Sequence, residues 1–326
     1  MRGYGAFDAK RDTPLFIQFS GGRTSGFMAA MAPEEVTITF QNTGREDEKT
    51  LEFVQRTSDA IKREVTWLEF RPPAKLGARP RDFQFEVVNF DTAARKGEPF
   101  AEFMKAINAY RIVKGKGLIS PWPKSRICTV HLKHRVLDHY LASLGITAHD
   151  RWIGLRADEE HRVAGLRRQE TLTKGLYAPL YEAGVDKAMV MDFWSRQSFD
   201  LGLPEHRGNC DGCFLKDQAD VSRALGGRPE DIAWWAEQQR LYPNFGGVTF
   251  HGYEALAHEL PTRLAIEAAY QGGSLPVNDG RLDAKRFKLV LIQERKRFEH
   301  GPAQFSCACE SGVDEDEEDD EDALAA

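Results

Sequence analysis

The sequence predicts an α/β fold built on a doubly wound parallel sheet. Up to residue 70, apolar strand-like stretches alternate with amphipathic helical windows, which is the pattern of consecutive β-α-β units. The first of these stretches runs directly into the glycine-rich SGGRTS, residues 20–25. A strand that turns sharply into a helix is a usual ligand-binding joint of such sheets, so the crevice of the fold is expected near this turn.

The elements of this pattern follow in order along the chain. PLFIQFS (14–20) predicts the first strand and VTITFQNTG (36–44) the second, with a short helix ended by Pro33 between them. EVTWLEF (64–70) predicts the third strand. The helix expected before it, over 46–65, has an apolar stripe at helical spacing, formed by Leu51, Val54, Ser58, Ile61 and Val65.

The rest of the chain gives weaker signals. Residues 71–125 predict long loops around a helix near 100–110. DRWIGLRADEEHR (150–162) predicts a second strand-to-loop joint, followed by a loop-rich, tryptophan-bearing region to about residue 250. Because the carboxyl ends of neighbouring parallel strands meet at one edge, the SGG and NTG turns are expected to lie side by side.

Composition allows an enzyme-sized core. The 326 residues are 41% hydrophobic and 29% charged, as in ordinary soluble globular proteins. No apolar run approaches the roughly 20 residues that span a bilayer, and residues 1–14 resemble neither a secretory signal nor a transit peptide. A cytoplasmic protein without a membrane partner is therefore expected.

Charge is distributed unevenly. The formal net charge of −6 includes nine negative charges from DEDEEDDED, residues 314–322, so the rest of the chain carries +3. We expect a mildly basic folded body and a solvated acidic tail, with partner binding by the tail as the alternative. Basic stretches at 71–81, 114–117 and 281–298 could contact nucleic-acid phosphates, although such runs are more often solvated faces.

SGGRTS has the composition of a phosphate-binding turn. Gly21 and Gly22 permit close approach of backbone N–H groups to phosphate oxygens. Ser20, Thr24 and Ser25 add hydroxyls and a helix start. The alternative is a helix cap after a tight turn, without a ligand.

Two further segments carry polar side chains after strand ends. NTG with Glu46 forms a second turn, or else only ends a strand before an acidic helix start. In GLRADEEHR, Arg156, Glu159 and Arg162 occur at three-residue steps and can face one side of a helical turn. Guanidinium groups suit phosphate or sulfate, and a carboxylate between them can orient them; solvated surface charge is the alternative.

The five cysteines are Cys128, Cys210, Cys213, Cys307 and Cys309. An odd number in a cytoplasmic chain argues against a disulfide framework and favours thiol or metal chemistry. CDGC (210–213) has the spacing with which two thiolates bind one metal. Zinc, and unliganded or redox-active thiols, remain alternatives to an iron–sulfur cluster.

These motifs together resemble the phosphoadenosine phosphosulfate (PAPS) reductase family, of the adenine-nucleotide alpha-hydrolase-like or PP-loop superfamily. The resemblance spans about residues 15–216 and implies a Rossmann-like sheet with a loop-rich, cysteine-containing C-terminal region. It divides the chain into a nucleotide-binding domain (13–216), a helical and cysteine-containing extension (217–312) and the acidic tail (313–326). The motifs that carry it, in order, are FSGGRTS (19–25), FQNTGREDEKTLEFV (40–54), CTVHLKHRVL (128–137), GLRADEEHR (154–162), YAPLYEAG (177–184) and GNCDGC (208–213).

The resemblance implies a site for ATP, adenylyl sulfate or PAPS. Arg156, Glu159 and Cys307 would be catalytic. Lys133 and His131 would add cationic charge near the same anion, with an exposed amphipathic helix as the alternative explanation of these two residues. The residues implied to bind the nucleotide are Ser20, Gly21, Gly22, Arg23, Thr24, Ser25, Thr43, Gly44, Lys133, Gly154, Arg156 and Arg162. The ATP-cleaving branch of the family usually has Asp where this chain has Thr24, which leaves open whether ATP is cleaved.

The resemblance also implies a 4Fe–4S cluster held by Cys128, Cys210 and Cys213. Members with a cluster usually carry a double cysteine at the first position, but Ile127 precedes Cys128 here. A fourth ligand is therefore expected from Cys307 or Cys309. Their segment, SCACE, also lacks the usual Glu-Cys-Gly tail signature of the family.

Three functions follow from these features. The first is sulfonucleotide reduction or sulfur transfer with a thiol or protein donor of electrons or sulfur. The second is ATP-dependent sulfur insertion into tRNA or DNA. The third is a non-catalytic protein that binds a nucleotide, is held together by a bound metal and acts through a partner. The oligomeric state is left open.

Overall fold

The structure is a computed structural model that describes most of residues 13–300. The described residues are 13–121, 128–167, 175–204, 207–208, 210–214, 216, 218–226, 228–243 and 252–300. Cys307, Cys309 and the acidic tail lie outside them.

A six-stranded, mostly parallel sheet forms the centre of the described chain, in the order β4-β3-β2-β1-β5-β6. Only β4 runs antiparallel to its neighbour, at one edge beside β3. The strands are β1 (Leu15–Gln18), β2 (Thr37–Asn42), β3 (Val65–Arg71), β4 (Gln84–Val88), β5 (Asp150–Trp152) and β6 (Leu176–Tyr177). The prediction of an α/β protein with a parallel sheet is confirmed at this level.

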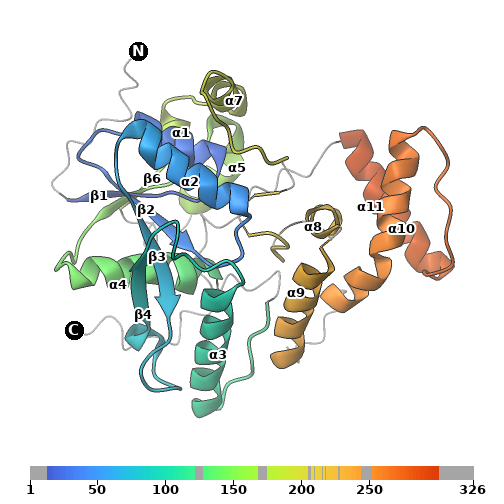
Figure 1. Ribbon diagram of the computed structural model, residues 1–326, viewed down its shortest axis with the longest axis horizontal. Coiled ribbons are helices and arrows are strands. Elements are labelled where there is room, and N and C mark those ends of the chain that lie inside the picture. Colours follow the sequence, from blue (N-terminus) through green and yellow to red (C-terminus); the bar gives the residue numbers. More distant parts are fainter. Residues whose placement is uncertain are drawn as a thin grey trace.

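Helices cover both faces of the sheet (Figure 1). α1, α2 and α7 lie on one face and α3 and α4 on the other, while α8 to α11 extend to one side of the sheet. Their bounds are α1 (Arg23–Met31), α2 (Glu48–Ile61), α3 (Glu98–Val113), α4 (Arg135–Ser143), α5 (Glu160–Arg167), α6 (Pro179–Glu182), α7 (Lys187–Ser195), α8 (Gln218–Leu225), α9 (Pro229–Leu241), α10 (Tyr253–Gln271) and α11 (Ala284–His300). Short turns are η2 (Pro80–Asp82), the π-helical η3 (Cys128–His134) and η4 (Ala157–Glu159).

Alternation along β1 explains how one strand serves two cores. Leu15 and Ile17 point to the core under α1, α2 and α7, whereas Phe16 points to the core under α3 and α4. Both sets are buried, so the strand reads as a continuous apolar run rather than an alternating one.

The second core continues beyond the predicted domain boundary at residue 216. Phe16 and Phe103 share it with Trp235 of α9 and Tyr253 of α10. Residues on both sides of the boundary therefore pack into one cluster, while Ile266 of α10 belongs to a separate small cluster with α11.

Several predicted elements differ from the structure. Strand β4 lies within a region expected to be loop, and its exposed or half-buried residues give it a weak sequence pattern. The region expected to be loop-rich to about residue 250 contains α6 to α9, whose sequences show no long apolar stripe. The helix expected to 65 ends at Ile61, because Lys62 adopts a left-handed conformation (φ 53°) and Val65 begins β3.

Within the described residues, no helix combines the length and apolar character required to cross a bilayer.

Candidate functional site

The candidate site lies beside β1, where the strand order of the sheet reverses. β1 pairs with β2 on one side and with β5 on the other, so β2, β3 and β4 lie toward one edge of the sheet and β5 and β6 toward the other. The carboxyl ends of β1 and β5 are adjacent, because Ile17 pairs with Trp152. Ligands of open α/β sheets bind at such a switch point, and the SGG loop and residues 153–156 flank it.

Gly21 gives the loop after β1 its shape. Its φ is +77°, and a Cβ on it would lie 2.4 Å from Cγ2 of Thr50. Gly22 begins α1 in an ordinary extended conformation, and a Cβ there would meet only Ser20 Oγ, at 3.6 Å. The first glycine is therefore required by the fold, whereas the second leaves open space above the start of α1.

The N-terminus of α1 has neither a capping side chain nor an acidic residue in its first turn among the described residues. The two serines of the loop are engaged locally: their Oγ atoms are 2.8 Å apart, and Ser25 Oγ donates to the carbonyl oxygen of Gly22 at 3.1 Å. The first-turn N–H groups and the helix dipole therefore favour an anionic ligand.

Arg23 connects the loop to the segment after α7. Its Nε donates to Asp200 Oδ1 at 2.7 Å, and its Nη1 donates to the carbonyl oxygen of Leu203 at 3.2 Å. The hydrogen bond from Arg23 lowers the pKa of Asp200 below its usual value. Its guanidinium, implied by the resemblance to bind nucleotide, is held by protein groups.

The segment after β5 brings Arg156 to the same loop. Arg156 Nη1 donates to Thr24 Oγ1 at 3.1 Å, and the guanidinium also binds both carboxylate oxygens of Asp158, at 2.9 and 3.0 Å. Burial alone would raise the pKa of Asp158, but the hydrogen bond and charge of Arg156 outweigh it and lower the pKa. Sequence reasoning missed Asp158, because a bidentate pair between residues two positions apart depends on the η4 turn.

Glu159 connects the two predicted arginines. It is buried, accepts a hydrogen bond from the Arg156 backbone N–H at 3.1 Å and accepts one from Arg162 Nη1 at 2.6 Å. Gly154 lies beside α1, since a Cβ on it would be 3.5 Å from Cα of Ser25. The predicted grouping of Arg156, Glu159 and Arg162 thus lies against the start of α1.

A second loop follows β2 and is organised by the buried carboxylate of Glu46. This carboxylate accepts hydrogen bonds from the Thr43 N–H at 3.0 Å, the Thr43 hydroxyl at 2.9 Å and the Arg45 N–H at 3.1 Å. Gly44 has φ +77°, and a Cβ on it would lie 2.9 Å from Pro99 Cδ. Glu46 therefore folds the loop onto itself, with its charge turned toward the interior.

The CDGC turn lies against this second loop. Cys210 forms an isolated antiparallel bridge with Glu46. Its Sγ lies 3.1 Å from Thr43 Oγ1 and donates to Glu46 Oε1 at 3.5 Å. The two motifs, some 165 positions apart in sequence, therefore share one set of contacts.

Cys128, Cys210 and Cys213 are buried, and each interacts electrostatically with the others. Burial, and then the charge of Cys213, raise the pKa of Cys128 to about 12. Burial followed by the charge of Glu46 raises the pKa of Cys210 well above its usual value. Without a metal, both groups are neutral thiols near pH 7.

Lys133 places a cation within this cysteine group. Its side chain is 8% exposed, and it interacts with the charges of Cys210, Glu46, Cys128 and Cys213. Burial alone would lower its pKa, but these neighbours outweigh burial and raise it. It comes from η3, and π-helical turns of this kind are frequent at functional sites.

The donor chemistry of the cysteine group fits a metal only in part. Cysteine sulfur is a ligand type that suits iron or zinc. Among the described residues, however, no group of three or more Cys, His, Asp or Glu side chains has an arrangement that could hold a metal ion. The fourth predicted ligand, Cys307 or Cys309, lies outside the described residues.

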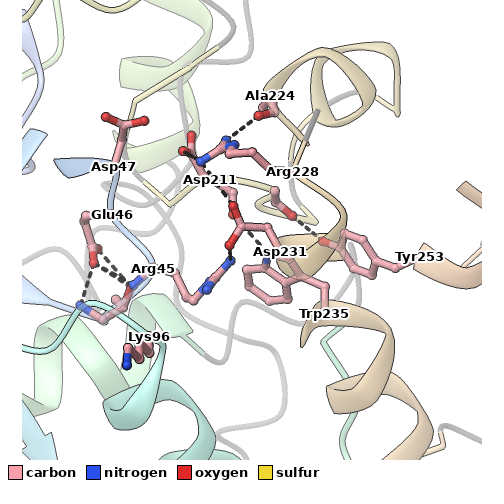
Figure 2. Close-up of polar contacts among 12 residues, drawn as sticks. Arg45, Glu46, Asp47, Lys96, Asp211, Ala224, Arg228, Asp231, Trp235 and Tyr253 are labelled. Carbon is pink, nitrogen blue, oxygen red and sulfur yellow. Dashed lines mark hydrogen bonds and ion pairs between the residues drawn. The ribbon is translucent and has the colours of Figure 1, made fainter. Parts of the chain in front are cut away.

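Aromatic residues from the C-terminal helices fix the CDGC turn. Trp235 Nε1 donates to the carbonyl oxygen of Asp211 at 3.0 Å, and the hydroxyl of Tyr253 donates to that of Gly212 (Figure 2). The two rings stack at 5.4 Å. Gly212 has φ +73°, and a Cβ on it would be 2.6 Å from Trp235 Nε1. The Trp235 ring therefore packs directly against Gly212 and leaves no room for a side chain there.

A network of alternating charges connects the second loop to α9, as Figure 2 shows. Arg45 Nη2 donates to Asp231 Oδ1 at 2.6 Å, and its guanidinium lies 4.5 Å from the centre of the Trp234 ring. Arg228 bridges Asp231 and Asp211 at 3.2 and 2.7 Å. Sequence reasoning missed this network, since no local signal pairs residues 186 positions apart.

Partly buried polar groups near the ends of β1 and β5 were also missed. His134 Nδ1 lies 3.1 Å from Gln18 Oε1 and 3.3 Å from Arg151 Nη1. Burial, and then the Arg151 charge, lower the pKa of His134 to about 3.

His131 lies in the same η3 turn. Burial, and then the charge of Arg135, lower the pKa of His131 to about 3, and its ring stacks on Phe103. A lowered pKa does not fit the cationic role expected for His131 near neutral pH.

No protein-family model matches the chain. The chain is similar to an uncharacterized nin region protein, ORF290, of Escherichia phage lambda, with 27% identity over 218 residues that cover 64% of this chain and 68% of that protein. That protein is itself described as uncharacterized, so the likeness assigns no activity.

Proposed function

We propose that this protein is an enzyme of sulfur chemistry that binds an adenine nucleotide, either ATP or a sulfonucleotide such as adenylyl sulfate or PAPS. The observation that carries the proposal is the position of SGGRTS at the β1/β5 switch point, where α1 begins without a capping side chain. A phosphate chain is the ligand that such a helix start binds best.

The nucleotide phosphates would lie over Gly22 and the first-turn N–H groups of α1. The open space at Gly22 supports this placement. Arg156, which reaches Thr24 Oγ1, would add a guanidinium at the side of the phosphate chain. Arg162, held by Glu159, would support it from the same turn.

The proposed fold type is that of the adenine-nucleotide alpha hydrolases, in the PAPS reductase family. It is supported by the glycine loop after β1, by the placement of β1 between β2 and β5, and by the Arg-x-x-Glu segment after β5. A second loop beside the first, at Thr43 and Gly44, would border the nucleoside.

Sulfur chemistry is proposed because the cysteine group adjoins the second loop. Thr43 and Glu46 both contact Cys210. In a reduction, the Cys307 thiolate would attack the sulfur of the sulfate group, and the bond from that sulfur to the phosphate oxygen would break, with the nucleotide as leaving group. A thiol or protein donor would then attack the cysteine S-sulfonate, become oxidised to a disulfide with Cys307 and release sulfite. The alternative is transfer of sulfur from such a donor. Glu159 would act by orienting Arg156 and Arg162.

Cys128, Cys210 and Cys213 would hold a 4Fe–4S cluster together with Cys307 or Cys309. The raised pKa of the buried thiols means that metal binding would have to displace their protons. Lys133 would then balance the negative charge of the thiolates. Such a cluster would supply redox capacity or a structural link between segments.

The test is anaerobic incubation of the purified protein with ATP, adenylyl sulfate and PAPS separately, with GTP as the nucleobase control. Calorimetry should detect binding of at least one adenine nucleotide and none of GTP. Product analysis for pyrophosphate, AMP, sulfite and phosphoadenosine identifies the reaction. Absence of binding by all three adenine nucleotides would contradict the proposal.

A further inference from the structure

The outer face of α11 carries cations that no other described residue neutralises. Lys285, Lys288 and Lys296 are exposed there, and none forms an ion pair with a described carboxylate. Between them lie the apolar side chains of Leu289 and Ile292, exposed by 46% and 43%. We call these five residues the outer face of α11.

The inner face of the same helix packs against α10. Val290 packs with Ile266 of α10, and Glu294 accepts a hydrogen bond from the buried Arg263 of α10 at 3.0 Å. Arg286 binds Glu259 of α10 at 2.5 and 2.9 Å. The orientation of α11 is thus fixed, so its outer face points away from α10.

We propose that the outer face of α11 is the docking surface for this chain's own acidic run, residues 314–322. The nine carboxylates of the run complement the three lysines, and apolar residues flank the run on both sides, Val313 before it and Leu324 just beyond it. Leu289 and Ile292 offer such flanking residues an apolar contact.

The length of the intervening chain permits this contact. Thirteen residues, 301–313, separate His300 at the end of α11 from the acidic run. They can span up to about 45 Å when extended, whereas a 17-residue helix is roughly 25 Å long. A tether of this length also gives an effective concentration on the order of millimolar, so individually weak ion pairs can act together.

The consequence is competition for polyanions. A bound acidic run would cover the lysines that could otherwise contact the phosphates of a nucleic acid. Nucleic acid is therefore the competing ligand in the test. This inference does not depend on the proposed nucleotide site, but it is linked to the proposed cluster: a metal bound by Cys307 or Cys309 would leave only the residues after that cysteine as the tether.

The test is lysine acetylation footprinting of the full chain, read by mass spectrometry. It compares the wild type with a variant in which all nine Asp and Glu residues of 314–322 are replaced by Asn and Gln. Lys285, Lys288 and Lys296 should react at least twofold more slowly in the wild type, whereas the exposed Lys62 and Lys75 should react equally in both. The difference should vanish in 1 M salt, where the Debye length is about 3 Å.

Three outcomes decide the inference. Equal reactivity of the α11 lysines in both chains would overturn it. Protection that disappears on tenfold dilution would also overturn it, because the occupant would then be a second copy. Tighter binding of a single-stranded DNA 20-mer by the neutralised variant than by the wild type, lost again on adding K285E/K288E/K296E, would support it.

Discussion

Thr43 Oγ1 lies 3.1 Å from Cys210 Sγ, and this contact joins the loop after β2 to the CDGC turn. The Glu46 carboxylate completes the junction, because it accepts hydrogen bonds from both residues. The two motifs therefore share one set of buried polar contacts. This relationship connects the proposed nucleotide site with the proposed sulfur site.

Glu46→Ala should destabilise the protein. Its carboxylate satisfies the buried N–H groups of Thr43 and Arg45, and a buried donor without an acceptor costs about 1–3 kcal/mol. Urea unfolding should show a loss of at least that size. The control, Glu48→Ala, removes a half-exposed ion pair with Arg95 and should cost no more than about 1 kcal/mol. Equal losses in the two variants would contradict the role given to Glu46.

Arg156→Ala and Arg156→Lys should both weaken nucleotide binding at least tenfold. A charge-assisted hydrogen bond contributes about 1.5–3 kcal/mol, and an ammonium group cannot reproduce the forked donor geometry of a guanidinium. Isothermal titration measures both affinities. Full binding by the lysine variant would show that charge alone matters, and full binding by the alanine variant would remove Arg156 from the site.

The ion pair of Arg23 with Asp200 should make stability depend on pH. The pKa of Asp200 is lowered in the folded chain, so its contribution is complete above its usual value of 3.8 and is lost as the pH falls through the lowered value. The free energy of unfolding of Asp200→Asn should therefore be below that of the wild type at pH 7, and this gap should close below pH 3.8. A gap that stays constant from pH 7 to pH 3 would exclude an ionic role for Asp200.

Protein prepared without oxygen should contain iron and acid-labile sulfide. Cys213→Ser should lose both, because CxxC spacing presents two of the ligands together. If Cys307→Ser keeps the metal but abolishes turnover, Cys307 is the nucleophile and Cys309 the ligand. Stoichiometric zinc without sulfide would contradict the iron assignment, and metal retained after loss of both Cys210 and Cys213 would remove the site.

The first half of the sheet could be predicted because its signals are local. β1 is a largely apolar buried strand, β2 and β3 are mostly buried and carry several large apolar residues, and Gly21 marks the turn after β1 by a backbone conformation that favours glycine. CDGC likewise brings Cys210 and Cys213 together by spacing alone. Local pattern is thus sufficient where the chain folds against its near neighbours.

Other parts of the structure depend on contacts that no local pattern encodes. β4 is an edge strand with mostly exposed residues, so it lacks the apolar pattern of the inner strands. Distant segments are joined by the ion pair of Arg45 with Asp231 and by the packing of the Trp235 ring against Gly212. The contact of Asp158 with Arg156 could not be predicted, because it forms only when the η4 turn is folded.

The central claim is that adenine-nucleotide phosphates bind over Gly22 at the start of α1, and titration of Gly22→Val tests it most directly. Gly22 has an ordinary φ of −97°, and a Cβ there meets only Ser20 Oγ at 3.6 Å, so valine should be tolerated by the fold while it fills the phosphate space. Gly117→Val, at an open position with nothing within 4 Å of its Cβ, is the matched control. The account predicts unchanged melting temperatures for both variants, wild-type affinity in Gly117→Val and no measurable nucleotide binding in Gly22→Val. Wild-type affinity in a folded Gly22→Val protein would contradict it.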